Sequence, residues 1–177
     1  GRNTNHIDVA ACTEKGIAVA AAGGGTSYST AELTWGLIIA SLRSIPHEIE
    51  RLKKGVWQTW VGVGLHGKTL GVYALGKIGG VVAQVGKAFG MKVTCWGRDA
   101  SLAKARELGY EVPASRAAFF GNADVVSLHI PLNKETRGIV TAADLACMKP
   151  TALMVNTSRA PLIEAGALLA ALKQGRP

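Results

Sequence analysis

The stretch "GKTLGVYALGKIGG", residues 67–80, contains two incomplete phosphate-binding motifs. Read from Gly71 it is G-x-x-x-x-G-K, which is most of the P-loop that binds nucleoside triphosphates. Read from Ala74 it is A-x-G-x-x-G, which is most of the glycine-rich turn that binds dinucleotides. The residues around the stretch decide which phosphate it suits.

The P-loop fits the stretch poorly. A P-loop needs Ser or Thr after its lysine, because that hydroxyl binds the Mg²⁺ of the triphosphate, and here the residue is Ile78. The first glycine of a P-loop opens the loop, whereas Gly71 lies inside the apolar run "TLGVY", residues 69–73, which predicts a strand. We therefore set the P-loop aside.

The dinucleotide turn fits better. Gly76 falls where the backbone approaches a pyrophosphate, and Gly79 falls where the helix packs closely against the strand. A helix predicted from about Lys77 directs free N–H groups and its positive dipole end at the phosphates. Ala74 replaces the first glycine, and its methyl group is costly only if the turn needs a positive φ. A glycine-rich turn without a ligand is the alternative, but the strand–turn–helix context favours binding.

The rest of the chain predicts an α/β fold, because short apolar runs alternate with helical segments. We predict strands over residues 17–21, 69–73, 92–96, 124–129 and 152–156, and helices over 29–45, 46–54, 77–89, 102–108, 142–148 and 164–173. Such runs suit a parallel sheet that is buried on both faces. The expected fold is a Rossmann-type doubly wound parallel sheet, whose ligands bind beyond the carboxyl ends of its strands.

Composition excludes several classes of protein. No apolar run approaches the roughly 18 residues of a membrane span, and the first residues lack the apolar part of a signal peptide, so we expect a cytoplasmic protein. The net charge of +8 invites a nucleic-acid partner, but the Lys and Arg residues are scattered and no recognition element accompanies them. Three widely spaced cysteines without C-x-x-C predict buried, reduced thiols and no metal site.

Two strand ends carry candidate ligand-binding residues. After the strand at 92–96, where a dinucleotide fold places an acid for the ribose, stand Gly97 and Arg98; an arginine without that acid suits the 2′-phosphate of NADP. The strand in "ALMVNTSRA", residues 152–160, ends in polar residues that include Arg159, whose guanidinium offers two parallel donors to a carboxylate. The alternatives are a solvated Arg98 and an Arg159 that pairs with a nearby acid.

Several segments, in this order, resemble the D-isomer-specific 2-hydroxyacid dehydrogenases, the family of 3-phosphoglycerate, glycerate and formate dehydrogenases. They are "NHIDVAACTEKGIAV", "STAEL", "KTLGVYALGKIG", "AFGMKV", "ADVVSLHIPL", "TRGIV" and "MKPTALMVNTSRAPLIEAGALLAALKQGR". In that family a substrate domain is split around an inserted cofactor domain. The resemblance implies that residues 1–24 are the trailing edge of the substrate domain. It also implies that residues 25–177 are an NAD(P)-binding domain, incomplete at its C-terminal end.

The resemblance also implies roles for residues of a cofactor site. Lys77 and Ile78 would lie against the pyrophosphate, and Gly97 stands where the family usually has the acid that binds the ribose. His129 and Pro131 would line the cofactor cleft. Since Gly97 and the neighbouring arginine depart from the usual pattern, the choice between NAD and NADP stays open.

At the substrate side, the resemblance places Thr157 and Ser158 beside the nicotinamide. Arg159 matches the arginine that holds the substrate carboxylate and polarises its C2 oxygen, and Ala160 replaces a common glycine. The acid/base histidine of the family and its partner glutamate match no residue of this chain, so we expect them beyond it. His129 is a tempting substitute, but a strand-end histidine is more often structural.

The implied activity is hydride transfer between C2 of a small 2-hydroxy or 2-oxo acid and the nicotinamide of NAD or NADP. The alternative is a dinucleotide-binding regulatory module without catalysis, built on the same fold. In the family the region of the helix at 29–45 contributes to a twofold dimer, so we expect a homodimer. An apolar stripe of this helix that faces only its own core is the alternative; its residues are Leu33, Leu37, Ile38 and Leu42.

Overall fold

The computed structural model describes residues 7–20 and 26–176 of the chain. Within these ranges, parallel strands pair in the order β2-β1-β3-β4. Their bounds are β1 (Thr69–Tyr73), β2 (Lys92–Trp96), β3 (Val125–Leu128) and β4 (Leu153–Asn156). The chain runs from β1 outward to β2 and returns to β3 on the other side of β1. The order therefore reverses between β1 and β3, which confirms the predicted doubly wound sheet and marks its ligand-binding crevice.

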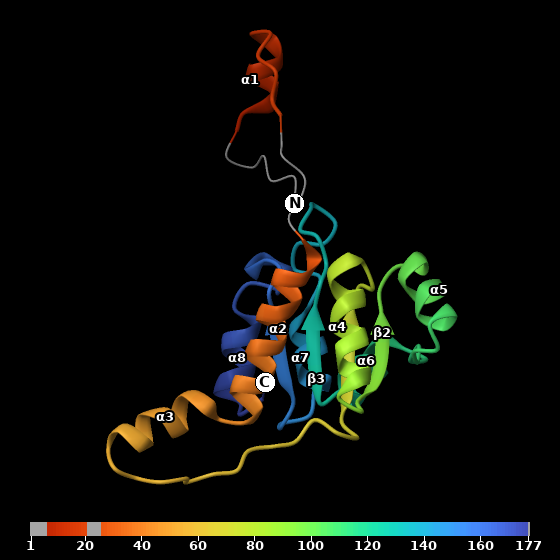
Figure 1. Ribbon diagram of the computed structural model, residues 1–177. Coiled ribbons are helices and arrows are strands. Elements are labelled where there is room, and N and C mark those ends of the chain that lie inside the picture. The colour runs from red at the N-terminus through yellow and green to blue at the C-terminus, as the bar shows by residue number, and fades with distance from the viewer. Residues whose placement is uncertain (1–6, 21–25, 177) are drawn as a thin grey trace.

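Helices cover both faces of the sheet (Figure 1). On one face lie α2 (Ser27–Leu42) and α4 (Lys77–Ala88), while α5 (Asp99–Glu107) packs beside β2. On the other face lie α6 (Arg116–Asn122), α7 (Ala142–Cys147) and α8 (Ala167–Lys173). The other helical segments are α1 (Val9–Glu14), α3 (Ile45–Lys53) and the 3₁₀ turn η1 (Ala160–Leu162). Both faces of the sheet are thus buried, as a parallel sheet requires.

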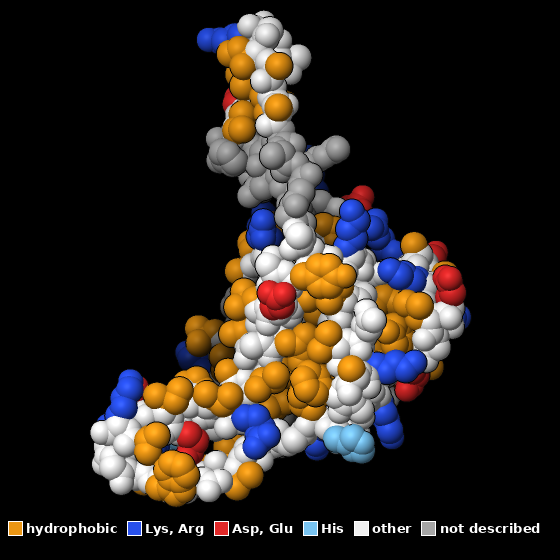
Figure 2. Space-filling view, viewed as in Figure 1, with side chains coloured by type: hydrophobic (Ala, Val, Ile, Leu, Met, Phe, Trp, Pro, Cys, Tyr) orange, Lys and Arg blue, Asp and Glu red, His pale blue; other side chains and the backbone are white. Residues whose placement is uncertain are grey.

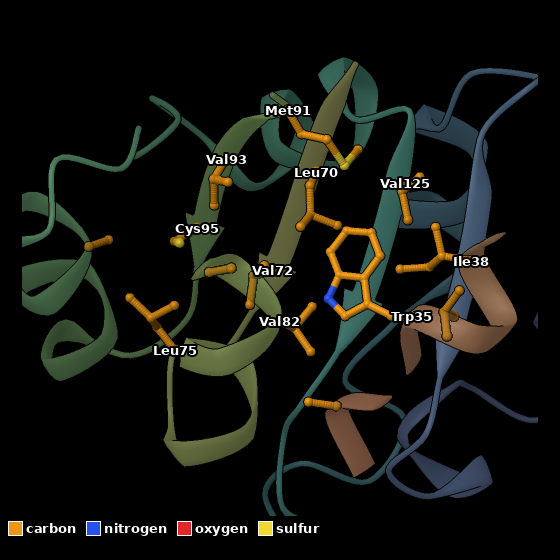
Figure 3. Packing of buried hydrophobic residues seen from close by; sticks show 14 residues of the cluster. Trp35, Ile38, Leu70, Val72, Leu75, Val82, Met91, Val93, Cys95 and Val125 are labelled. Carbon is orange, nitrogen blue, oxygen red and sulfur yellow. The ribbon is translucent and has the colours of Figure 1, made fainter. Parts of the chain in front are cut away.

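The core between α2, α4 and the sheet is closely packed (Figure 3). Trp35 reaches from α2 towards Leu70 of β1 and Val82 of α4, and all three side chains are buried. Gly86 allows this approach, because a Cβ at that position would lie 2.5 Å from the Leu70 Cδ2 atom. A glycine in α4 therefore sets how closely the helix lies on β1.

Several predicted elements differ from the structure. Residues 17–20 form no strand, and Ile17 is 55% exposed, because no described strand pairs with them; residue 21 and the predicted domain boundary at 24–25 fall outside the described residues. Helix α2 buries Ile38 but leaves Leu33 and Leu37 exposed, so the predicted stripe is only partly a core face. The sequence reasoning missed α1, α6 and η1, and it began the last helix about one turn early.

The structure also shows where the cysteines lie and whether the described residues contain a membrane-spanning helix or a metal-binding group. All three cysteines are free, and burial raises the pKa of Cys95 to about 12, but Cys147 is exposed and Cys12 is half-buried, so the prediction of three buried thiols was wrong. Among the described residues, no helix combines the length and the apolar character that crossing a membrane demands. The same part of the chain contains no group of three or more His, Cys, Asp or Glu side chains placed for a metal ion.

Candidate functional site

The carboxyl ends of the four strands form one edge of the sheet, because neighbouring strands are in register there. Tyr73 pairs with Trp96 and with Leu128, and Leu128 pairs with Asn156. The residues that follow the strands therefore lie in a row along this edge: Ala74, Gly97, His129 and Thr157. The predicted site residues are up to 85 positions apart in the sequence, and the fold brings the start of each segment that carries them to this one row.

The start of α4 offers hydrogen-bond donors to a ligand. Gly76 is its N-cap, and no side chain caps the helix. The first backbone bond within the helix runs from the Gly80 N–H to the Gly76 carbonyl, so the preceding N–H groups have no acceptor inside the helix. A Cβ built on Gly76 meets no atom within 4 Å. The space in front of these donors is therefore open to an anion, which fits the pyrophosphate of a dinucleotide.

Gly79 has the packing role that its spacing predicts. A Cβ at Gly79 would lie 2.3 Å from the Ala74 carbonyl oxygen and 3.1 Å from a methyl group of Val72. Only glycine lets α4 approach the end of β1 this closely. The turn thus divides its glycines between two tasks: Gly76 leaves room for a ligand, and Gly79 leaves room for the strand.

Ala74 has a positive φ, the backbone conformation that is costly for any residue with a Cβ. Its φ is 74°, in the left-handed region, where an L-residue with a Cβ pays roughly 1–2 kcal/mol relative to its preferred conformations. A hydrogen bond of 2.8 Å from the Ala74 N–H to the Trp96 carbonyl holds the turn in place. The turn therefore keeps the positive φ that favours glycine, although residue 74 is an alanine.

The end of β2 leaves no room for the usual acid. Gly97 has φ 152°, and a Cβ there would lie 3.1 Å from the Ser101 Cβ and 3.4 Å from the Ala74 Cα. Ser101 also accepts a hydrogen bond of 3.2 Å from the Leu75 N–H, which fastens α5 to the turn. Arg98 is the exposed N-cap of α5 and forms no ion pair with any described residue. Gly97 thus stands where most dinucleotide folds present a carboxylate, and the exposed Arg98 follows it.

The remaining cofactor-side residues lie around this edge. Lys77 is exposed on the first turn of α4, and Ile78 is half-buried against the core. The Lys104 ammonium lies 3.7 Å from where a Cβ on Gly80 would be, over the same end of α4. Pro131 is exposed in the segment after β3. The site therefore has a basic character that is visible as Lys and Arg side chains over the upper ends of α4 and α5 (Figure 2).

His129 is a neutral group. Its Nε2 atom lies 2.9 Å from the Ser127 Oγ, and its Nδ1 atom is buried without a partner among the described residues. Burial lowers the pKa of His129 to about 4, so only about one molecule in a thousand carries the imidazolium at pH 7. His129 is thus poorly suited to replace the family's acid/base histidine, in agreement with the structural alternative.

The Arg159 loop is held by a set of short hydrogen bonds. The Asn156 side chain accepts from the Ser158 N–H at 3.0 Å and donates to the Arg159 carbonyl at 2.9 Å. The Ser158 hydroxyl donates to the Leu128 carbonyl at 2.9 Å, which ties the loop to β3. The Arg159 side chain is exposed and forms no ion pair with any described residue, so the alternative of a nearby acidic partner finds no support.

Four contacts of the site involve residues that the sequence reasoning missed: Thr34, Ser101, Lys104 and Ser127. The Thr34 hydroxyl of α2 lies 2.9 Å from the Thr157 hydroxyl, across 123 positions of the sequence. No local pattern signals such a contact. A serine one turn into the helix after β2 could have pointed to Ser101, because α5 has to meet the turn at the end of β1.

Comparison with known proteins places this site in a family. Residues 35–177 match the family model "D-isomer specific 2-hydroxyacid dehydrogenase, NAD binding domain". The chain is 42% identical to D-3-phosphoglycerate dehydrogenase of Methanocaldococcus jannaschii, covering 99% of this chain and 34% of the relative. It is 37% identical to glyoxylate reductase of Aeropyrum pernix, covering 97% of this chain and 53% of the relative.

Solved structures agree with the sequence relatives. The crystal structure of phosphoglycerate oxidoreductase from Vibrio cholerae O395 matches with a TM-score of 0.93 and 49% identity, over 99% of this chain and 56% of that one. The apo-structure of D-lactate dehydrogenase from Escherichia coli matches with a TM-score of 0.87 and 31% identity, over 98% and 55%.

The chain belongs to the D-isomer-specific 2-hydroxyacid dehydrogenase family and carries its NAD(P)-binding portion. It spans one third to about half of the length of the relatives above. The resemblance seen in the sequence is confirmed, and so is the use of NAD or NADP as the cofactor.

Proposed function

We propose that the protein is an NAD(P)-dependent oxidoreductase that acts on the CH–OH group of a D-2-hydroxy acid, or on the corresponding 2-oxo acid in reverse. The observation that carries the proposal is Arg159: an exposed guanidinium, held by its loop and without an acidic partner among the described residues. It follows β4 on the same edge as the open start of α4. The family's acid/base histidine and its glutamate match no residue of this sequence, and the proposal does not rest on them.

Each group at the edge has a task in this reaction. The nicotinamide, when bound, supplies the carbon that gives or takes the hydride. The N–H groups at the start of α4 bind the pyrophosphate, aided by the helix dipole. The Arg159 guanidinium binds the substrate carboxylate through two parallel hydrogen bonds. Holding cofactor and substrate on one rigid sheet edge aligns the two reacting carbons.

The geometry favours NADP(H) over NAD(H). A carboxylate side chain at position 97 would need a strained backbone, with φ near 152°, and a shift of Ser101 by a few tenths of an ångström, so this edge offers the usual partner of the ribose hydroxyls only at a cost. Arg98 instead places a cation at the start of α5, and the Lys104 ammonium reaches Gly80 near the start of α4 from the last turn of α5. Arg98 follows a glycine that stands in place of the usual acid, and Asp99 lies in the next position, in the first turn of α5. An arginine at this end of β2 suits the charge of a 2′-phosphate, so removing Arg98 should cost NADPH affinity but not NADH affinity.

The test of the function is Arg159→Lys, together with Arg159→Ala, in the complete protein. Lysine keeps the charge but loses the paired donors, so we expect both variants to lower turnover with 2-oxo acids about 100-fold or more. Binding of NADPH, followed by tryptophan fluorescence, should stay within about twofold of wild type. Arg106→Ala, at an exposed site in the last turn of α5, is the matched control. Unchanged turnover in the Arg159 variants would remove this residue from the reaction.

The non-catalytic regulatory module remains the second candidate, and the same experiment separates it from the enzyme. Such a module binds the dinucleotide but turns over no 2-hydroxy or 2-oxo acid in the complete protein, and its Arg159 variants behave as wild type. An unpartnered arginine at the substrate edge favours the enzyme, because an exposed cation on the cofactor edge has no evident task in a module that binds only the dinucleotide.

We also propose a homodimer built on α2 and α3. Leu33 and Leu37 of α2 are 57% and 43% exposed, and α3 has no buried residue. Helix α3 projects from the body of the molecule in Figure 1, and hydrophobic side chains follow it in Figure 2. A cavity of about 560 Å³ lies between α2, α3 and the segment with Trp57 and Trp60. Sedimentation equilibrium should show a dimer that Leu37→Glu converts to monomer, whereas a monomeric wild type would contradict the assignment.

A further inference from the structure

Three oxygen atoms link α2 to the end of β4. The Thr34 hydroxyl lies 2.8 Å from the Thr30 carbonyl, one helical turn earlier, and 2.9 Å from the Thr157 hydroxyl. Thr34 is 0% exposed, so water does not compete for these contacts. Thr157 is half-buried at the carboxyl edge of the sheet, two residues before Arg159.

The direction of this hydrogen-bond chain follows from the number of protons. A carbonyl has no proton, so the short contact with Thr30 requires Thr34 to donate. A hydroxyl has a single proton, so Thr34 then has none to give to Thr157. Thr157 must therefore donate to Thr34, and the chain runs one way, from Thr157 through Thr34 to Thr30.

The neighbouring hydroxyl is oriented in the same sense. Ser158 donates its only proton to the Leu128 carbonyl at 2.9 Å. Both hydroxyl protons of the Thr157–Ser158 pair are thus directed into the protein, and only oxygen lone pairs are left for a ligand. The next residue, Arg159, has only donors. The loop therefore offers two hydrogen-bond acceptors followed by a cation. A ligand group that donates protons fits the two hydroxyl oxygens, whereas a group that only accepts, such as a carboxylate, fits Arg159.

We propose that Thr34 is a positioning residue that fixes Thr157 as a hydrogen-bond acceptor for the carboxamide NH₂ of the bound nicotinamide. This inference rests on the proposed function, with the nicotinamide at the end of β4 beside Thr157, where the family resemblance implies it. A carboxamide NH₂ has two protons to donate, which matches two acceptor oxygens, whereas a carboxylate or an acetyl group offers none. Thr34 itself is buried in α2 and touches neither cofactor nor substrate.

The test compares two dinucleotides that differ only in this group. The probes are NADPH and its 3-acetylpyridine analogue, in which a methyl group replaces the NH₂, and the readout is the Kd of each from fluorescence titration of the complete protein. Wild type should bind NADPH about tenfold more tightly than the analogue, the effect of one hydrogen bond. Thr34→Val frees the Thr157 proton and should reduce this ratio to about twofold, whereas Thr34→Ser, which keeps the hydroxyl, should retain it.

Other outcomes have equally defined meanings. Thr157→Val should reduce the ratio to the same extent, because it removes the acceptor while keeping the shape of the side chain. If Thr34→Val lowers the melting temperature but leaves the ratio of the two Kd values unchanged in folded protein, Thr34 only fastens α2 to the sheet and the inference is wrong. If NADPH binds well and Thr157→Val has no effect on the ratio, the inference fails while the proposed function stands. If wild type binds neither probe, both fail.

Discussion

Ala74 is the residue whose conformation conflicts most clearly with its side chain. Its φ of 74° costs roughly 1–2 kcal/mol, and glycine at this position would remove that cost while adding about 0.4–1 kcal/mol of unfolded-state entropy. We expect Ala74→Gly to raise the free energy of unfolding by about 0.5 kcal/mol and Ala74→Val to lower it by more than 1 kcal/mol, measured by urea denaturation. A stabilising Ala74→Val would show that the turn does not hold this φ.

His129 gives the protein a defined sensitivity to acid. Its pKa falls from 6.5 in the unfolded chain to about 4 in the folded protein because of burial. Between these values the unfolded chain binds more protons, so the free energy of unfolding should fall by up to about 3 kcal/mol as the pH is lowered from 6.5 to 4. His129→Gln should flatten this slope in denaturation curves taken across the window.

The matched control for that experiment is His47→Gln, at an exposed histidine of α3. It should keep the slope of wild type. Asp124 and Asp144 also lose stabilisation in acid, because their hydrogen-bond partners lower their pKa values, but most of that loss falls below about pH 4, after the unfolded carboxyls have begun to bind protons near pH 5. An unchanged slope in His129→Gln between pH 6.5 and 4 would mean that this imidazole is not buried as neutral.

Single residues also show what sequence could predict about the site. The roles of Gly76 and Gly79 follow from their spacing, because the turn and the helix start are local structures. The place of Arg159 follows from the end of an apolar strand. Thr34 could not be found in this way, because its contact with Thr157 depends on how α2 lies across β4. The absence of an acidic partner for Arg159 among the described residues likewise depends on the fold, because the fold decides which distant segments lie near it.

At the scale of elements, α4 carries two glycines with opposite effects. A Cβ on Gly80 meets only the Lys104 ammonium, at 3.7 Å, whereas a Cβ on Gly86 would lie 2.5 Å from the buried Leu70 side chain. Gly80→Ala should therefore raise the free energy of unfolding by about 0.5–1 kcal/mol through helix propensity. Gly86→Ala should lower it by about 1–2 kcal/mol through overpacking.

Thermal and urea denaturation of the two variants check this contrast, and each serves as the control for the other because both change glycine to alanine in one helix. If both variants were stabilised, α4 would not lie on β1 as closely as the structure has it. If both were destabilised, helix propensity would not govern the exposed side of α4.

The elements that sequence predicted well are those with their own periodicity and boundaries. Strands β1 and β2 and helix α3 follow from apolar runs, glycines and Pro46. The strand predicted over 17–21 was wrong for its described residues, because an apolar run forms a strand only beside a partner. Helix α6 was missed because its seven residues are too short to show a helical period; it is fixed by two buried aromatic residues, Phe119 and Phe120.

At the scale of the whole molecule, the parallel order of the strands creates the site. Four chain segments reach one edge of the sheet, and each adds a different property: an open helix start, a basic corner, a neutral imidazole and an oriented arginine loop. The net charge of +8 suits an anionic dinucleotide. This edge does not identify the hydroxy acid, because the carboxylate that we assign to Arg159 is common to all candidate substrates.

We have proposed that the open start of α4 binds the pyrophosphate of NAD(P), and the Gly76→Asp variant tests this binding site. The backbone at Gly76 has φ −77° and ψ −157°, which any residue adopts, a Cβ there meets nothing, and aspartate is a favourable N-cap. The variant should therefore melt at or above the wild-type temperature. Its carboxylate would occupy and repel the phosphate position.

The measurement is a fluorescence titration of wild type and Gly76→Asp with NADPH and with NADH. We predict saturable binding to wild type, and at least a 100-fold weaker affinity for both dinucleotides in a variant that is as stable as wild type. Equal affinities in the two proteins would contradict the account, because the dinucleotide would then bind somewhere other than the start of α4.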